Sequence, residues 1–456
     1  MTSNMPNYLK RKRMLLMIAV YLGAFQTNAL GQVLSLKESI NYTLQHHPSS
    51  TIYKYSAQTA VEKIRESKSA FLPSVSGSIG LDYNIKLQTT VIPAGSFSAT
   101  ETKLQMGNRF SNTASIQADQ NLFNKSASVD IAAAKVDKEI ADLNVLKQNQ
   151  TLIYNTASAY YQALTYAEKG RLLRESEKQY ETMVGVLKLR YEQGEVKKSE
   201  YDRARVNYNN VQSEIQANNS AYQLTLNTLK NCMGLELETV IAIEDSVSIA
   251  DVKDISLMAT SSTLEPGNII DYRIDQKNLE LKSLEVRQKK VAFLPTISMY
   301  GKYGGNAYGS DFIPALGNWF DYSTIGVKAT IPIYSGYKKK SQLEQSKLNF
   351  ASQELTNKLN LQTYKLNVEN ASTQIVSAYT NLKKSEENLQ LAREMMDAST
   401  IEYKEGTTTL SSLLDAEYSY KEARTTYTTT LLDYLNARLS YYNNTGTITQ
   451  FVNELK

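Results

Sequence analysis

Two long stretches of the chain repeat large side chains every seven residues, and each follows a short turn that contains a glycine. Positions seven apart lie on one stripe of a helix, so each series predicts a coiled-coil seam. Gly194 and Gly406 can take the positive φ that ends a helix. Each stretch is therefore predicted to fold back on the helix before it. The two series are Tyr201, Tyr208, Ile215, Tyr222 and Leu229, then Leu413, Tyr420, Tyr427, Tyr434 and Tyr441.

The same signals recur at an offset of about 212 residues, which predicts two copies of one structural unit. Each copy reads helix, Leu-Pro, strand, loop, strand, long helix, Tyr-x-x-Gly turn and return helix. The copies are predicted over 32–234 and 269–443, with a linker over 235–268 and a polar tail over 444–456. Their β-hairpins are expected over 74–123 and 296–334, and their helical hairpins over 125–232 and 338–442.

Beyond Pro73 the period of the pattern changes to two, with Val75, Ile79 and Leu81 on one face and serine, glycine and aspartate on the other. About 13 alternating residues is long for a sandwich strand and suits a tilted strand across a bilayer. The segments 88–107 and 307–319 are predicted to be loops on the outer side. Four strands cannot close a barrel, and open edges are costly in lipid. Several chains must then combine, and three would give about twelve strands.

The N-terminus predicts export. Four basic residues, 10–13, precede an apolar run from Met14 to Phe25, and small residues end at Gly31. This pattern is typical of a secretory signal peptide over 1–31. No later stretch reaches the roughly 18 apolar residues of a membrane helix.

Composition favours neither nucleic-acid binding nor catalysis. The net charge of the 456 residues is only +4, and basic residues are interspersed with acidic ones along the helices, which indicates solvated faces. His46 and His47 point about 100° apart on a helix, so joint metal binding is not expected. Cys232 is the only cysteine, which excludes an internal disulfide. With no phosphate loop or nucleophile elbow, we expect no enzyme and no cofactor.

The duplicated order of elements resembles the TolC-like outer-membrane efflux family over nearly the whole mature chain. The repeated Ser-Ala-Tyr at 158–160 and 377–379 and the Leu-Leu-Asp-Ala at 413–416 add to the likeness. The resemblance implies an α+β membrane protein: a homotrimer with a twelve-stranded β-barrel in outer-membrane lipid and a twelve-helix coiled-coil tunnel in the periplasm. It also implies a periplasmic adaptor and an inner-membrane transporter of the RND or ABC type. The chain would be a passive exit duct.

The resemblance further implies a gate at the periplasmic mouth, formed by the two turns. By position, Tyr403 matches the gating tyrosine, Ser199 and Glu200 match a hydroxyl and carboxylate pair, and Asp415 matches a constriction carboxylate. The sequence departs from the family pattern at Thr408 and Ser412, where the best-known member has arginine and a second aspartate. The predicted gate residues are Gly194, Ser199, Glu200, Tyr403, Gly406 and Asp415.

Alternatives stay open at this point. Asp415 fits a solvated helix position as well, and Tyr403 fits a packed seam. An outer-membrane component of type I protein secretion would share the whole architecture. A secreted coiled-coil structural protein with a soluble sheet is the alternative from another class.

Overall fold

The computed structural model describes residues 32–93, 95, 100, 102–244 and 265–455. The predicted signal peptide, 1–31, lies outside them, as does the middle of the predicted linker. The described chain forms two compact units. The helical unit takes its residues from Met1–Ser50, Gln148–Asn268 and Tyr364–Lys456, and the sheet unit from Thr51–Lys147 and Ile269–Thr363.

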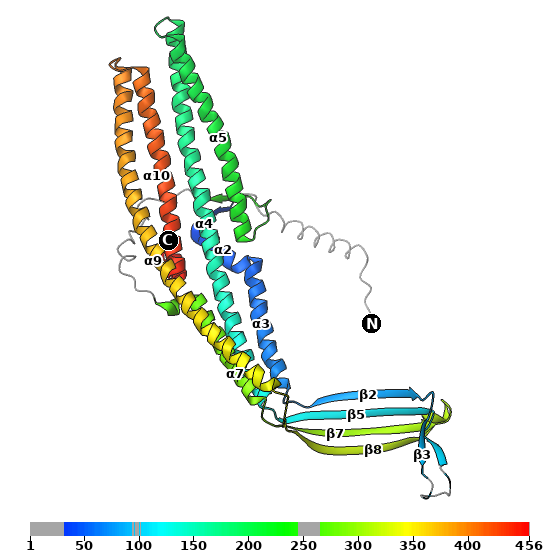
Figure 1. Ribbon diagram of the computed structural model, residues 1–456. Helices are drawn as coiled ribbons and strands as arrows, with labels where there is room; N and C mark the ends of the chain where they lie inside the picture. The colour runs from blue at the N-terminus through cyan, green and yellow to red at the C-terminus, as the bar shows by residue number, and fades with distance from the viewer. Residues whose placement is uncertain (1–31, 94, 96–99, 101, 245–264, 456) are drawn as a thin grey trace, which may run out of the picture. The chain divides into compact units, whose positions relative to one another are not determined.

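The sheet unit holds four antiparallel strands in the order β2-β5-β7-β8 (Figure 1). The register pairs Ser74 with Asp119, Phe110 with Gly309 and Thr296 with Thr330. The central β5–β7 pair joins the two sequence repeats, so the four strands predicted for one chain form a single sheet. Their bounds are β2 Ser74–Tyr83, β5 Phe110–Phe123, β7 Thr296–Gly309 and β8 Trp319–Thr330.

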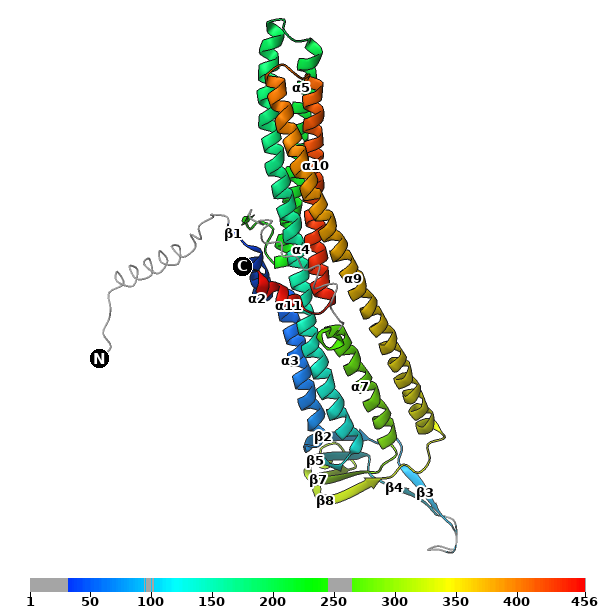
Figure 2. The ribbon, with the colours of Figure 1, turned by 90° about the vertical axis from the view of Figure 1, so that its left-hand side faces the viewer.

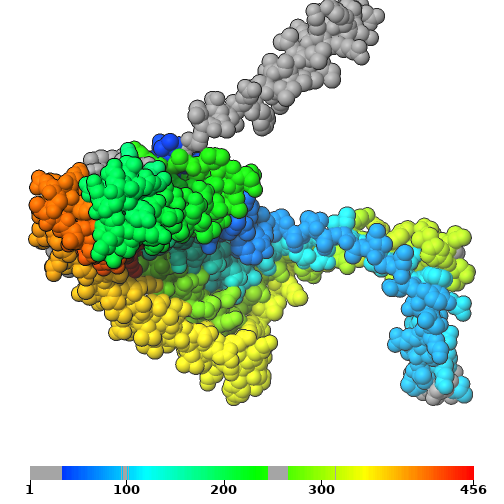
Figure 3. All heavy atoms as spheres, turned by 90° about the horizontal axis from the view of Figure 1, so that it is seen from above, coloured from blue at the N-terminus to red at the C-terminus, as the bar shows by residue number. Residues whose placement is uncertain are grey.

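Both predicted loops contain regular structure. The segment 88–107 holds a second hairpin of β3 (Gln88–Ile92) and β4 (Thr102–Met106), drawn in light blue and cyan in Figure 3. Its β-branched run at 89–92 favours a strand. The segment 307–319 holds the short helix α8 (Pro314–Gly317).

The last strand ends earlier than the predicted hairpin over 296–334. It stops at Thr330, two residues before Pro332. Proline has no N–H to donate to a strand ladder, which accounts for the earlier end.

The helices of the sheet unit are α3 (Pro48–Ser69), α7 (Ile270–Val291) and the adjoining parts of α4 (Lys125–Glu192) and α9 (Lys338–Lys404). Polar contacts tie them together. Lys277 on α7 forms a 2.6 Å ion pair with Glu139 on α4, and the Asn357 amide on α9 donates to the Asp275 carbonyl at 2.9 Å. The Leu-Pro end of α3 is fixed by Asn121, whose amide donates to the Ala70 carbonyl at 2.8 Å.

The helical unit is built on two hairpins, α4 with α5 (Lys198–Met233) and α9 with α10 (Leu410–Asn444), shown in Figures 1 and 2. Their ends differ by at most two residues from the predicted ranges, 125–232 and 338–442. Ion pairs join them, with Arg424 bonded to Glu175 at 2.9 Å and Lys421 to Glu214 at 2.6 Å. Among the described residues, none of the helices has the length and apolar character needed to cross a membrane.

A tyrosine-rich core forms where the two hairpins pack on each other and on the short elements of this unit. Tyr434 is fully buried and its ring lies 5.6 Å from that of Tyr379. A parallel pair of short strands, β1 (Gln32–Leu34) and β6 (Ile241–Ile243), is held by the Tyr160 hydroxyl, which donates to the Leu34 carbonyl at 3.0 Å. The predicted linker thus contributes a strand, as well as a 3-10 turn, η2, at Pro266–Asn268.

The two histidines lie at the junction of α2 (Leu36–His46) and α3. The His46 ring stacks on Tyr42 at 4.3 Å, and the His47 Nδ1 accepts the Ser49 N–H at 3.1 Å. α3 begins with Pro48, whose missing N–H needs no partner at the first position of a helix. Within the described ranges no three metal-binding side chains come together.

The segment after residue 443, expected to be a polar tail, contains the helix α11 (Ile448–Glu454). Ile448 and Phe451 are fully buried, and the Glu454 carboxylate accepts from Tyr442 and Arg438 at about 3.1 Å. Two apolar residues three positions apart are too short a pattern to predict a packed helix.

Phe451→Ala tests whether α11 belongs to the core. Emptying this site is expected to cost about 3–5 kcal/mol of unfolding free energy, because no neighbour can refill it. Denaturant unfolding of the detergent-purified protein, followed by circular dichroism, gives the measurement. The exposed neighbour serves as control, since Gln450→Ala is expected to stay within about 0.5 kcal/mol. Equal effects of the two variants would show that α11 does not stabilise the unit.

Candidate functional site at the hairpin tips

The two turns have the same backbone geometry. Gly194 has φ 78° and Gly406 has φ 77°. The Glu195 N–H donates to the Arg190 carbonyl at 2.8 Å, and the Thr407 N–H donates to the Glu402 carbonyl at 2.9 Å. A left-handed residue with a bond spanning five residues is the Schellman end of a helix. The glycine of each Tyr-x-x-Gly signal is therefore the residue that reverses the chain.

The return helices begin differently. Thr409 caps α10, since its hydroxyl accepts the Ser412 N–H at 3.2 Å, whereas α5 begins after Lys197 with no side-chain cap. The Ser412 hydroxyl also lies 3.1 Å from the Thr409 hydroxyl. Ser412, one of the departures from the family pattern, is therefore part of the cap. Thr408, the other, is half-buried beside it.

The predicted gate residues lie at these tips but do not contact one another within the chain. Tyr403 is half-buried, Glu200 is half-buried, and Ser199 and Asp415 are exposed. In the described part of the chain, none of these four side chains makes a hydrogen bond or ion pair. The one polar contact between the starts of α5 and α10 found there is a weak 3.4 Å bond from Arg203 to the Ser411 hydroxyl.

Tyr403 packs instead on an apolar cluster that joins the two hairpins, here called the tip cluster. Leu187 is almost completely buried in it, and Leu410 and Leu414 bring α10 against α4 and α5. The packing interpretation of Tyr403 therefore holds inside one chain. The tip cluster consists of Tyr180, Leu187, Ala204, Val211, Leu410 and Leu414.

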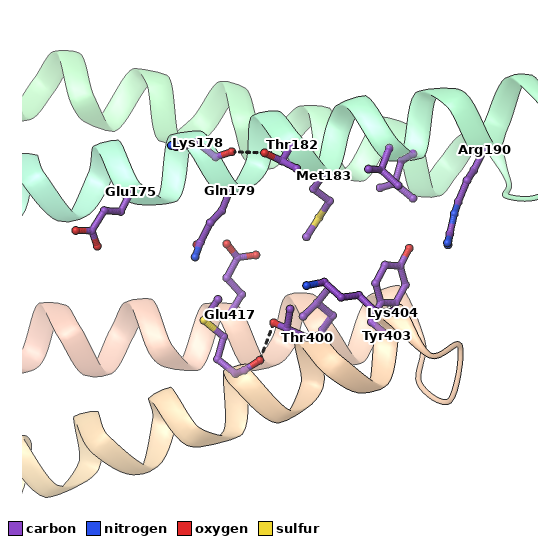
Figure 4. A pocket seen from close by; sticks show the side chains of 14 residues that line it. Glu175, Lys178, Gln179, Thr182, Met183, Arg190, Thr400, Tyr403, Lys404 and Glu417 are labelled. Atoms are coloured by element: carbon purple, nitrogen blue, oxygen red, sulfur yellow. Dashed lines mark hydrogen bonds between the residues drawn. The ribbon is translucent and has the colours of Figure 1, made fainter.

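Beside the tip cluster lies a cavity of about 680 Å³, lined by α4, α9 and α10. Figure 4 shows the Tyr403 ring and the Glu417 carboxylate in the gap between these helices. Its apolar lining is Met183, Val186, Leu187, Met396 and Leu413, and its charged lining is Glu175, Lys178, Arg190, Lys404 and Glu417.

Glu417 is the residue of this site that sequence reasoning missed. It is only 7% exposed, and neither carboxylate oxygen makes a hydrogen bond of ordinary geometry. Burial raises the pKa of Glu417 to about 7, although the nearby Tyr180 hydroxyl and Lys421 ammonium act to lower it. The available signal was its spacing, because Glu417 lies three and four residues after the buried Leu414 and Leu413.

The chain matches the model of the outer membrane efflux protein family over residues 40–235 and 275–447. It belongs to this family. The two matched segments follow the two repeats predicted from the sequence.

Individual members of the family show the same relationship at low identity. Outer membrane protein TolC of Escherichia coli is 24% identical over 413 residues, covering 86% of this chain and 78% of that protein. Alkaline protease secretion protein AprF of Pseudomonas aeruginosa is 23% identical over 238 residues, about half of each chain. The crystal structure of the outer membrane protein VceC of Vibrio cholerae aligns with a TM-score of 0.71 at 18% identity, covering 90% of this chain and 96% of that one.

Family membership confirms the main interpretation. The protein is an outer-membrane efflux channel of the TolC family with its helical part in the periplasm, and it is a transport protein rather than an enzyme. The likeness to VceC confirms the fold of long helices and a four-stranded sheet. The secreted scaffold is thereby excluded.

Two glycines with different backbone conformations test the geometry of the turn: Gly406 has a positive φ, and Gly185 lies inside the helix α4. Gly406→Ala is expected to destabilise the second tip by about 1 kcal/mol, because alanine disfavours positive φ. Gly185→Ala, inside α4 with open space around it, is expected to stabilise by a similar amount, about 1 kcal/mol. Hydrogen exchange of peptides spanning each site should change about fivefold in opposite directions. Identical responses would contradict the assigned backbone geometry.

Proposed function

We propose that three copies of this chain form the exit duct of a tripartite efflux system, which conducts substrates passively out of the periplasm. The supporting observation is the four-stranded sheet, in which β2 and β8 each have one edge unpaired within the described chain. An open edge in lipid leaves backbone N–H and C=O groups without partners, at several kcal/mol each. Pairing β8 of one chain with β2 of the next removes every edge when three chains close a twelve-stranded barrel.

The outer strands support a lipid-facing surface. Ile79 on β2 and Ile325 on β8 are about 80% exposed, and neighbouring side chains at the same spacing are also apolar. An apolar surface of this kind needs lipid or protein to cover it. We assign it to the outer membrane. The residues are Val75, Ile79, Leu81, Ile325 and Val327.

An uncovered stripe on α9 supports contacts between neighbouring chains. Four leucines are 57–70% exposed and follow each other at intervals of seven, four and seven residues. This spacing is that of a coiled-coil seam. A helix of a second copy would bury it. The leucines are Leu348, Leu355, Leu359 and Leu366.

The duct would receive its substrates from a periplasmic adaptor and an inner-membrane transporter of the RND or ABC type. Conduction needs no catalysis by this chain, since the transporter supplies the energy. Type I protein secretion is the second candidate function, and the similarity to a protease secretion protein favours it. Either cargo would pass through the same duct.

The tips would form the gate. Tyr403, Ser199 and Glu200 have no partner within the described chain, so their polar groups are available to a neighbouring copy. A hydrogen bond from Tyr403 of one chain to Ser199 or Glu200 of the next would hold the mouth closed. Asp415, exposed on α10, would place one carboxylate per chain near the axis.

Removing the hydrogen-bonding groups tests the gate. Tyr403→Phe combined with Glu200→Ala is expected to raise single-channel conductance in planar bilayers and to shorten closed times, because the contact between chains is lost. The matched control is Tyr191→Phe, the same change at the equivalent position of the first turn, where the ring stacks on Tyr201. Unchanged conductance and closed times in the double variant would refute the gate assignment.

Ion selectivity tests Asp415. Asp415→Asn is expected to lower the ratio of cation to anion permeability, because a ring of carboxylates attracts cations. Ser412→Asp is expected to raise this ratio by adding a carboxylate at the neighbouring family position. Reversal potentials in asymmetric salt give the measurement. If neither variant shifts the reversal potential, Asp415 is an ordinary solvated residue.

A further inference from the structure

We propose that Glu417 is a proton-dependent positioning residue at the joint between the two helical hairpins: neutral Glu417 lets the tips pack tightly, and ionised Glu417 loosens them. This inference goes beyond the duct and its gate, because it concerns contacts inside a single chain.

The position of Glu417 is the first support. The residue lies on α10 next to the tip cluster, with its carboxylate directed toward α4 in Figure 4. It lines both the 680 Å³ cavity and a second cavity of about 390 Å³ between α4, α5 and α10. Glu417 is therefore a buried charged group that borders both cavities between α10 and α4.

The poor pairing of the carboxylate is the second support. Both carboxylate oxygens are inaccessible and make no hydrogen bond of ordinary geometry in the described structure, although the Tyr180 hydroxyl is nearby. A buried carboxylate without a partner is costly when ionised, so it is held neutral or the surrounding packing opens to hydrate it. The pKa of Glu417, raised to about 7 by burial, agrees with the neutral form at mildly acidic pH.

The charged groups around Glu417 are mostly engaged elsewhere. From α4, Glu175 is bonded to Arg171 and Arg424, and from α5, Glu214 is bonded to Lys421 at 2.6 Å. The Tyr180 hydroxyl is next to the carboxylate, and burial together with Glu417 raises the pKa of Tyr180.

Three further cations line the 680 Å³ cavity. Lys178 of α4 and Lys404 of α9 are exposed, and Arg190 of α4 is half-buried. None of them forms an ion pair with Glu417 in the described chain. The half-buried Tyr403 completes the titratable groups that α9 places there.

The direction of the pH effect follows from the difference in the pKa of Glu417 between the tight and the loose arrangement. Burial raises the pKa of Glu417 to about 7 in the tight arrangement, and hydration of the carboxylate would return the pKa toward its ordinary value of 4.5. The tight arrangement therefore binds the proton more strongly and is favoured by acid. The ratio of loose to tight tips should rise up to about tenfold per pH unit between roughly pH 5 and 7 and then level off.

A spin-label distance across the joint tests the proposal. Labels are placed at the exposed positions 188 on α4 and 397 on α9 by Lys188→Cys and Asp397→Cys, with Cys232→Ser, in the full mature chain purified in detergent. Labelled chain is diluted with unlabelled chain so that only the distance within one chain is read. We expect a shorter distance at pH 5 and a growing longer population up to pH 7.

Substitutions of Glu417 separate the effect of its ionisation from the effect of its packing. Glu417→Gln is expected to keep the short distance from pH 5 to 8, and Glu417→Met serves the same purpose if glutamine prevents folding. Glu417→Asp should retain a pH-dependent distance. The exposed Glu422 on the same helix is the matched control, and Glu422→Gln should behave as wild type.

Three results would overturn the proposal. These are a distance in the wild-type chain that does not change with pH, a pH dependence that survives in Glu417→Gln, or tighter packing at high pH. The last would mean that ionised Glu417 pairs with a cation such as Lys404. Because no conductance is involved, the outcome is independent of whether Tyr403 gates the channel.

Discussion

The unpaired edges of β2 and β8 are the constraint on which the rest of the architecture depends. One chain supplies four strands, and in the described structure the backbone of each outer strand is bonded on one side only. In water such edges invite aggregation, and in lipid they are not tolerated. The exposed leucine stripe of α9 poses the same problem for the helices. Assembly with further copies, as proposed, would cover both features, and the single chain would then be an incomplete part of a channel.

Duplication explains the regular part of the molecule, and departures from it mark the specialised parts. The turns at Gly194 and Gly406 have the same backbone geometry, and the two strand pairs meet in one sheet. Three departures are the Thr409 cap on α10, the β3–β4 hairpin of the first repeat and the buried Glu417 of the second. Two of these three lie at the hairpin tips, where we propose the gate.

The sequence predicted the long elements because their signals are periodic and occur twice. The helix ends at Leu-Pro, the four long strands and the tyrosine heptads are present as expected, although β8 ends at Thr330, before the predicted end at 334. The sequence did not predict the short elements, because their stability comes from distant partners. β1 pairs with β6 more than two hundred residues away, and α11 depends on burying Phe451. The burial of Glu417 was not predicted, because an acidic residue in a helix normally indicates a solvated face. The proposed gate contacts involve a neighbouring chain, so no periodic pattern within one chain predicts them.

The mass of the detergent-purified mature protein, measured by light scattering and corrected for bound detergent, tests the central claim most directly. If three chains share their edge strands, the particle has three times the mass of one mature chain. A protein that stays folded and monomeric without detergent would contradict the account, because the edges of its sheet would then need no partner.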